Sequence, residues 1–429
     1  MKSLLRITFA AFLALLARAI LRKYKPNIIM VTGSVGKTST KDAVAAMLSN
    51  QGHMRASEKS YNSEFGVPLT IIGMKNPWAS PAAWLNVFEE AIALLVMPSH
   101  YPKTLVLEVG ADRPGDLARI LKIATPDAVV VTRLPEVPVH VEAYSTPAAV
   151  REEEFAPAYA LPTGAPLVIS SRDEHAISMA RNTQASTTVF GFSQEADVRI
   201  DEPTVEMVDG SPVGMIATAH AHGSDYVIRA KGVLGRPQIL APAAAFAMGL
   251  ALNVPAEEAL RGLEDYVPPA GRGRILSGKN GSLLIDESYN ASPAAVEEAL
   301  TALTLLSTAK RKIAVLGDML ELGRYSVTEH ARIGTLAARD VDMLIAVGSR
   351  SRAMCAAALD AGLTSEQTYC FENAADASVM LMKEVREGDA VLIKGSQSMR
   401  MERIAELLLA NPEDTKLLVR QEKEWKEKE

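Results

Sequence analysis

Two patterns of apolar residues alternate along most of the chain: short β-rich runs and longer stretches at helical spacing. After the first β-rich run, at residues 28–32, a glycine-containing loop leads into a helical pattern from Ser39 to about Ser49. Strands that alternate with helices form parallel sheets, because the crossover helices cover the faces of the sheet. The first half of the chain is therefore predicted to be α/β, with strands at residues 28–32, 104–109, 128–132 and 166–170.

The second half of the chain starts with a different pattern and then returns to this one. Between Val198 and Ala230 short alternating runs with turns such as Asp209-Gly210 predict hairpins at a sheet edge, and residues 243–252 predict a closely packed helix. Pro268-Pro269 marks a domain boundary. Beyond it, strands are predicted at residues 282–286, 312–316, 343–347 and 390–394. We expect a central parallel-sheet domain over residues 26–268 and a Rossmann-like α/β domain over residues 269–429.

The first 25 residues form an apolar segment of their own. Residues 7–21 would rise only about 22 Å as a helix, which is short of the roughly 30 Å hydrocarbon core of a membrane. We expect an amphipathic helix, which either packs on the protein or lies on the inner membrane surface. The apolar residues at helical spacing are Leu5, Phe9, Phe12, Leu13, Leu16 and Ile20.

Composition narrows the classes of partner. The chain of 429 residues is 48% hydrophobic and 22% charged, as in ordinary globular proteins, and its net charge of −6 argues against nucleic acid as the main partner. Cys355 and Cys370 lack metal-ligand spacing, so we expect two buried free thiols and a reducing cytosol. The charge-rich segment from Asn411 to Glu429 predicts a solvated helix or a frayed end.

A phosphate-binding loop follows the first predicted strand. Glycines let backbone N–H groups approach phosphates, a lysine neutralises the β- and γ-phosphates, and a hydroxyl can bind Mg²⁺. Val31 stands where the full pattern has another glycine. The position of the loop between strand and helix favours an ATP site. Its predicted nucleotide-binding residues are Gly33, Ser34, Gly36, Lys37, Thr38 and Ser39.

Seven segments in the same order resemble the Mur ligase family. The phosphate loop resembles the shortened loop of these enzymes, and the resemblance runs from about Pro26 to Leu409. The C-terminal segments are similar to the branch that joins D-alanyl-D-alanine to a muramyl peptide. Besides the loop, the segments are residues 61–69 (YNSEFGVPL), 108–112 (EVGAD), 138–140 (PVH), 286–293 (DESYNASP), 317–323 (GDMLELG) and 394–400 (KGSQSMR).

The resemblance assigns roles in the central domain. Thr38, Glu108 and His140 would bind Mg²⁺, and phosphoryl transfer to a carboxylate needs such a metal and cations around the γ-phosphate. Glu108 also ends a predicted strand, where α/β sites place functional side chains. Asn62 and Ser63 would contact the substrate. The residues expected to carry catalysis are Lys37, Glu108, His140 and Glu153.

The same resemblance assigns roles to residues of the C-terminal domain. Arg272 would reach the nucleotide. Lys394, Ser396 and Arg400 lie at a strand-to-helix turn that suits a carboxylate group. The residues expected to contact ATP or the incoming amine are Asp286, Tyr289 and Asn290.

The sequence departs from the family in three places. Glu153 stands where we align the family's carbamylated lysine, and we expect its carboxylate to support the metal while Glu152 and Glu154 point away. Residues 235–241 lack the histidine and asparagine that the family has near the adenine. We also expect the hydrophobic helix to stand in the place of the family's N-terminal UDP-binding domain.

The function expected from these motifs is ATP-dependent amide formation through an acyl phosphate, in peptidoglycan synthesis. The substrates would be a muramyl peptide and D-alanyl-D-alanine, handled by a cytoplasmic monomer that needs ATP and Mg²⁺. Two alternatives are open. One is a Mur-type ligase with a different carboxylate and amine. The other is a catalytically silent scaffold, which is suggested by the departures from the family pattern at Glu153, Pro237 and Ala241.

Overall fold

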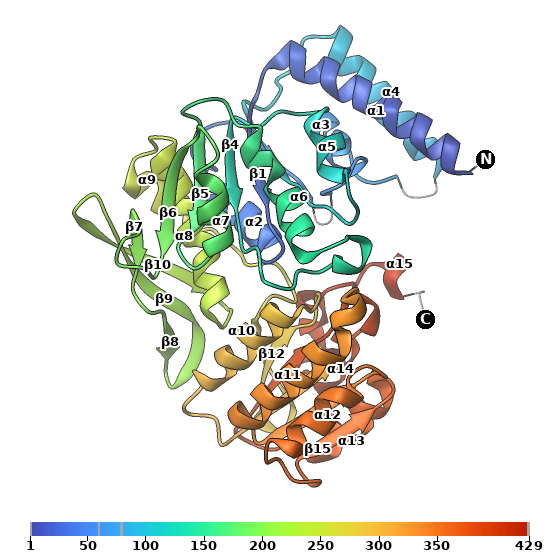
Figure 1. Cartoon of the computed structure of the whole chain (residues 1–429), viewed down its shortest axis with the longest axis vertical. Helices are drawn as coiled ribbons and strands as arrows, with labels where there is room; N and C mark the ends of the chain where they lie inside the picture. The colour runs from blue at the N-terminus through green and yellow to red at the C-terminus, as the bar shows by residue number, and fades with distance from the viewer. Residues whose placement is uncertain (1, 59–60, 78–79, 427–429) are drawn as a thin grey trace. The chain divides into compact units, whose positions relative to one another are not determined.

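The computed structural model describes residues 2–58, 61–77 and 80–426. The chain forms two compact units. Unit 1 comprises residues 1–201, 219–226 and 240–266, and unit 2 comprises residues 202–218, 227–239 and 267–429. Each has its own hydrophobic core, and the described residues form two sheets of mostly parallel strands together with many helices, so the predicted α/β fold class is confirmed (Figure 1).

The sheet of unit 1 is built around β1. Its parallel strands follow the order β7-β6-β5-β4-β1-β3-β2, with β1 between β4 and β3. The inner strands are apolar on both faces, as expected where helices cover a parallel sheet. The strands are β1 (Asn27–Thr32), β2 (Met54–Ala56), β3 (Thr104–Glu108), β4 (Ala128–Val131), β5 (Pro166–Ser170), β6 (Ser186–Gly191) and β7 (Val198–Ile200).

Antiparallel strands follow β7, as the hairpin pattern predicted. They are β8 (Thr204–Val208), β9 (Ser211–Ala221) and β10 (Ser224–Lys231). The helices that precede the predicted boundary at Pro268-Pro269 are α1 (Lys2–Tyr24), α2 (Lys37–Met47), α3 (Gly66–Ile72), α4 (Pro81–Val96), α5 (Asp116–Leu121), η1 (Val141–Ala143), α6 (Pro147–Tyr159), α7 (Glu174–Ala180), α8 (Arg236–Ala251) and α9 (Ala256–Leu263).

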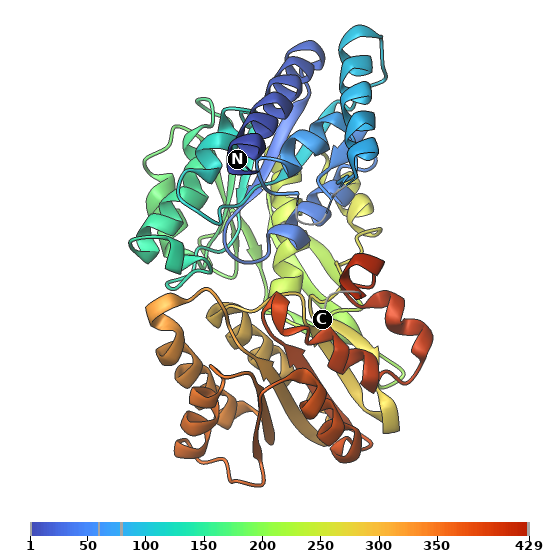
Figure 2. The ribbon, with the colours of Figure 1, turned by 90° about the vertical axis from the view of Figure 1, so that its right-hand side faces the viewer.

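Helix α1 packs on unit 1. Figures 1 and 2 show it beside α4, and its side chains Leu13, Ala17 and Ile20 are fully buried in the core cluster. At its C-terminal end the Lys23 Nζ donates to the carbonyls of Leu94 and Met97, both at 2.7 Å, at the end of α4. Packing on the protein, one of the two predicted positions of this helix, is therefore confirmed for its described side chains.

No helix in the described part of the chain combines the length and the apolar character needed to cross a bilayer.

Unit 2 carries a second sheet, in the order β11-β12-β16-β13-β14-β15, in which only β11 is antiparallel to its neighbour. The four predicted strands are β12, β13, β14 and β16. Its elements are β11 (Arg274–Ser277), η2 (Lys279–Gly281), β12 (Leu283–Glu287), α10 (Pro293–Thr304), β13 (Arg311–Gly317), η3 (Gly323–Tyr325), α11 (Ser326–Asp340), β14 (Met343–Val347), α12 (Arg352–Asp360), β15 (Thr368–Phe371), α13 (Ala374–Glu384), β16 (Asp389–Lys394), η4 (Gln397–Met399), α14 (Glu402–Leu408), η5 (Pro412–Leu417) and α15 (Lys423–Lys426).

Two expectations for unit 2 are wrong. Cys355 on α12 and Cys370 on β15 form a disulfide rather than two free thiols, because these two elements pack together and bring the Cα atoms to 6.6 Å. The C-terminal segment is not simply solvated. Leu418, Val419 and Arg420 are buried, and Arg420 donates to the backbone carbonyl of Ser288 at 2.6 Å.

Candidate functional site

The predicted phosphate loop lies at the carboxyl end of β1, where the neighbours of the strand are β3 and β4. Ligands of open α/β sheets bind at this kind of edge. Gly33 has φ +114°, and a Cβ there would lie 2.3 Å from the Thr132 hydroxyl oxygen, so only glycine fits. Gly36 is left-handed and precedes α2, whose first turn holds the buried Thr38 and Ser39.

Lys37 lies inside the loop and is paired with an acid. Its Nζ donates to the Gly33 carbonyl and lies 3.7 Å from the Glu154 carboxylate. Glu154 is almost fully buried and accepts a hydrogen bond from the Ser34 hydroxyl. The Thr32 hydroxyl holds the Glu154 backbone carbonyl at 2.6 Å, which fixes α6 against the loop.

Burial raises the pKa of Glu154, although the charge of Lys37, the Ser34 hydroxyl and the charge of His140 each lower it. Removing a carboxylate from water disfavours its charged form, and this cost exceeds the help from the neighbours. The structure thus places an acid with a raised pKa beside the lysine expected to meet the nucleotide.

The acid beside Lys37 is Glu154, one residue after the Glu153 that the alignment with the family indicated. The two carboxylate oxygens of Glu153 accept the backbone N–H groups of Gly115 (3.0 Å) and Leu117 (2.9 Å), away from the loop. The expectation that Glu154 points away is therefore wrong. Adjacent helical residues differ by about 100° in direction, so an error of one position in the alignment exchanges the two roles.

Glu108 ends β3 opposite Val31 of β1 and is almost fully buried. Its backbone N–H donates to the Ser57 hydroxyl at 3.1 Å. Its Oε2 atom makes no hydrogen bond within the described part of the chain. A buried carboxylate oxygen without a partner fits a hard cation such as Mg²⁺.

His140 lies beside Asp112 and does not complete a metal site with Glu108. Its Nε2 lies 3.5 Å from the Asp112 carboxylate. Among the described residues no three His, Cys, Asp or Glu side chains are grouped as a metal site would need. The predicted joint set of Glu108, His140 and Glu153 is therefore not assembled, because Glu153 faces α5. Mg²⁺ usually keeps waters and substrate phosphates as ligands, so one carboxylate and the Thr38 hydroxyl still suit it.

The predicted substrate loop adjoins the phosphate loop. A Cβ on Gly110 would lie 3.2 Å from the Asn62 amide nitrogen and 3.3 Å from the Lys37 Cε. The Gly110 N–H also donates to the Asn62 carbonyl at 3.2 Å. Asn62 and Lys37 therefore converge on one glycine, and Ser63 follows Asn62 in the same loop.

Unit 2 gathers its predicted site residues at the carboxyl end of its own sheet. The Lys394 Nζ is buried, lies 3.0 Å from the Glu287 carboxylate and donates to the Asn290 carbonyl at 3.0 Å. Burial lowers the pKa of Lys394, while Glu287 opposes that shift. The Ser396 hydroxyl accepts from the Leu320 N–H at 2.9 Å. This edge therefore joins three segments that the sequence motifs had singled out separately.

Three further predicted residues lie around this edge. The Arg272 guanidinium stacks over the Tyr289 ring at 4.2 Å. Asp286 is fully buried, and burial raises its pKa. Its Oδ1 accepts from the Ser288 N–H at 3.1 Å, whereas its Oδ2 has no hydrogen bond within the residues that the structure covers.

Sequence reasoning missed a buried charge network beside these residues. Glu402 accepts from the Arg400 Nε at 2.6 Å and lies 3.2 Å from the Arg420 guanidinium. Arg400 is thus tied to Glu402 and has a left-handed backbone. Glu402 and Arg420 stand outside the quoted motifs, and only tertiary packing brings them to the edge.

Two models of known protein families match the chain. The Mur ligase middle domain matches residues 31–247, about half of the chain, and the Mur ligase glutamate ligase domain matches residues 271–397. The chain belongs to the Mur ligase family. As a Mur ligase it is an ATP-dependent ligase, and the predicted resemblance is confirmed.

Relatives within the Mur ligase family carry the same name in several bacteria. The UDP-N-acetylmuramoyl-tripeptide–D-alanyl-D-alanine ligase of Mycobacterium leprae is 31% identical, over 94% of this chain and 77% of that protein. The Bacillus subtilis protein of that name is 26% identical, over 92% and 79%. The crystal structure of Thermotoga maritima MurF in complex with ADP has a TM-score of 0.75 and 26% identity, covering 93% of this chain and 83% of that one.

Proposed function

We propose that this protein joins D-alanyl-D-alanine to the free carboxylate of a muramyl tripeptide, using ATP. The named relatives carry out this ligation, and the chain covers more than two thirds of each. The observation that carries the proposal is the loop with Gly33, Lys37 and Thr38 at the carboxyl end of β1. Beside it, the Glu108 carboxylate has an oxygen that accepts no hydrogen bond from any residue that the structure describes.

The reaction has two steps. The acceptor carboxylate attacks the γ-phosphorus of ATP, which forms an acyl phosphate and releases ADP. The amine of the dipeptide then attacks the acyl carbon, inorganic phosphate leaves, and the amine gives up a proton as the amide forms. The Lys37 ammonium and the backbone N–H groups of the loop stabilise the negative charge of the transferring phosphoryl group.

We further propose that Mg²⁺ assists this transfer, held by Glu108 and Thr38. When bound, the ion would neutralise phosphate charge. Glu154, rather than Glu153, supplies the second anion of the site. Its carboxylate lies 3.7 Å from the Lys37 ammonium, and the charges of Lys37 and His140 favour its ionised form, although burial raises its pKa.

The proposed function predicts a defined product. ADP release would be followed with ATP, D-alanyl-D-alanine and a set of muramyl tripeptides, with mass spectrometry of the products. We expect ADP release that depends on both substrates and a product heavier by the dipeptide less one water. ADP release with another carboxylate and amine would instead indicate a different Mur-type ligase. The absence of turnover with every pair would support the silent scaffold.

We also propose that the enzyme works as a monomer in the cytosol and touches the inner membrane surface through α1 and α4. Exposed apolar side chains on these helices include Phe12, Leu15 and Ile92, and the exposed Arg22 follows on α1. Apolar side chains beside cations suit anionic lipid headgroups. Leu15→Glu should reduce sedimentation with anionic vesicles, and sedimentation equal to that of the native protein would contradict the contact.

A further inference from the structure

Lys41 is a buried cation for which the proposed reaction has no use. It lies on α2, one helical turn after Lys37, and is only 3% exposed. Its Nζ forms an ion pair with the Asp42 carboxylate and donates to the backbone carbonyl of Ser57 at 2.7 Å. Removing an ammonium from water costs free energy unless polar partners replace the water. These two contacts therefore hold Lys41 between α2 and the residue that follows β2.

Ser57 connects this cation to the candidate metal ligand. It directly follows β2 and is buried. Its N–H donates to the Val106 carbonyl of β3 at 2.9 Å, and its hydroxyl accepts a hydrogen bond from the Glu108 N–H at 3.1 Å. Lys41, Ser57 and Glu108 thus form one chain of buried contacts from α2 to the end of β3.

This chain of contacts joins the two elements that carry the ligands proposed for Mg²⁺. Thr38 lies in the first turn of α2, three residues before Lys41. Glu108 ends β3, and its Oε2 accepts no hydrogen bond from any residue that the structure describes. Mg²⁺ tolerates little deviation in the placing of its ligands. A contact that fixes β3 against α2 therefore bears on the metal site even though it lies outside it.

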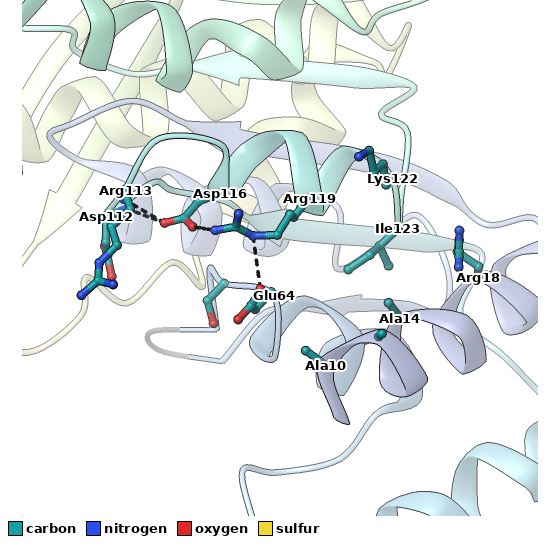
Figure 3. Close-up of a pocket in the computed structure, with 12 residues that line it drawn as sticks. Ala10, Ala14, Arg18, Glu64, Asp112, Arg113, Asp116, Arg119, Lys122 and Ile123 are labelled. Atoms are coloured by element: carbon teal, nitrogen blue, oxygen red, sulfur yellow. Dashed lines mark hydrogen bonds and ion pairs between the residues drawn. The ribbon is translucent and has the colours of Figure 1, made fainter. Parts of the chain in front are cut away.

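On its solvent side, the segment that follows β3 is held by a different cation. Asp116 accepts the Asp112 N–H at 3.1 Å and pairs with Arg119, which lies 3.2 Å from the Glu64 carboxylate (Figure 3). These side chains line a cavity of about 880 Å³ between α1, α5 and the loop that precedes α3. Arg119 is half-exposed, and water weakens such pairs. It therefore offers a matched comparison for Lys41.

We propose that Lys41 is a positioning residue for the metal site. Through Ser57 it holds the backbone of Glu108, and with it the carboxylate, in place relative to Thr38. Groups that orient metal ligands typically contribute roughly ten- to a hundredfold to metal affinity. The inference rests on the proposed binding of Mg²⁺ by Glu108 and Thr38, and it adds the residue that sets their spacing.

The test measures the Mg²⁺ requirement of nucleotide binding without turnover. Each protein is mixed with a fluorescent, non-hydrolysable ATP analogue, and the bound analogue is followed by anisotropy as the free Mg²⁺ concentration rises. Lys41→Met should raise the half-saturating Mg²⁺ concentration at least about tenfold, and Ser57→Ala should raise it in the same direction. The control Arg119→Gln should keep the native value. The analogue bound at saturating Mg²⁺ should be the same in all four proteins, because Lys37 and its loop are retained.

Three results would overturn the proposal. They are an unchanged half-saturating concentration in Lys41→Met, an equal rise in Arg119→Gln, and a loss of analogue binding at every Mg²⁺ concentration in a folded Lys41→Met protein. The last result would mean that Lys41 supports the nucleotide site as a whole. Thermal melts check folding. If Lys41→Met does not fold, Lys41→Gln, which is uncharged and one bond shorter than lysine, is judged by the same criterion.

Turnover separates this inference from the proposed reaction. If no acceptor and amine support ADP release but Lys41→Met still raises the half-saturating Mg²⁺ concentration, the ligation fails and the positioning role stands. If ligation proceeds and that concentration is unchanged, the positioning role fails and the reaction stands. Analogue binding to the native protein that does not depend on Mg²⁺ would remove the metal site and the role of Lys41 together.

Discussion

At the scale of single residues, the pairing of Lys37 with Glu154 dominates the phosphate loop. The buried carboxylate lies 3.7 Å from the ammonium and also accepts a hydrogen bond from the Ser34 hydroxyl, so these contacts hold the cation within the loop. Lys37 and Glu108 could be predicted from the sequence because a short motif and a strand end define them. Glu154 could not, because three consecutive glutamates differ only in the direction that α6 gives them.

Replacing Lys37 tests the electrostatic role of the loop. We expect Lys37→Ala to lower ADP release by at least about a thousandfold, since the ammonium opposes charge that develops in the transferring phosphoryl group. The melting temperature should stay close to that of the native protein. Near-normal turnover in a folded variant would remove the loop from the mechanism.

Glu153 and Glu154 form a matched pair for a second prediction. Glu154→Gln should slow ADP release at least about tenfold, because it removes the anion beside Lys37. Glu153→Gln should leave turnover nearly unchanged and cost about 1 kcal/mol of stability, because Gly115 and Leu117 lose a charged acceptor. Steady-state kinetics measures the turnover of the two variants, and thermal melts measure their stability. The reverse pattern would return the catalytic role to Glu153.

The pH dependence of stability gives a third prediction. Burial raises the pKa of Glu154 above its ordinary 4.5, so just above pH 4.5 the folded state keeps a proton that the unfolded state has lost, and the folded carboxyl becomes an anion only at higher pH. Stability from this group therefore falls as the pH rises above about 4.5, until the folded carboxyl ionises. The unfolding free energy of Glu154→Gln relative to the native protein should increase between pH 4.5 and pH 8. Parallel curves for the two proteins would show that Glu154 titrates normally.

At the scale of elements, the strands and long helices follow the apolar pattern closely. β14 coincides with its predicted range, β16 differs from its range by one residue at one end, and β12 and β13 differ from theirs by one residue at each end. Apolar runs suffice there because both faces of the inner strands are covered. The disulfide between α12 and β15 and the docking of Arg420 could not be predicted, since each depends on contacts between elements distant along the chain.

Helix α1 yields a prediction at this scale. Ile20 is fully buried in the core cluster of unit 1, whereas Leu15 on the same helix is 55% exposed. Ile20→Ala should cost about 2–4 kcal/mol of unfolding free energy, and Leu15→Ala should cost well under 1 kcal/mol. Urea unfolding of both variants measures the difference. Equal small effects would mean that α1 is not docked in solution.

At the scale of the whole molecule, the chain forms two units with their own cores; the Mur ligase glutamate ligase domain lies within the second unit, whereas the range of the middle domain, residues 31–247, includes residues of both. The order of motifs along the chain predicted the family and the fold class. It did not predict that residues 202–218 and 227–239 belong to the second unit, because compactness depends on packing rather than on position in the sequence. The cavity on α1 was equally invisible, since its lining comes from three separate segments.

The central claim, ligation through an acyl phosphate, is tested most directly by isotope transfer. The acceptor carboxylate would be labelled with ¹⁸O and incubated with ATP, D-alanyl-D-alanine and the enzyme, and the released phosphate analysed by mass spectrometry. The proposed mechanism predicts one ¹⁸O atom in each phosphate, because the carboxylate oxygen that attacks the γ-phosphorus leaves with it. Unlabelled phosphate accompanying amide formation would contradict the mechanism.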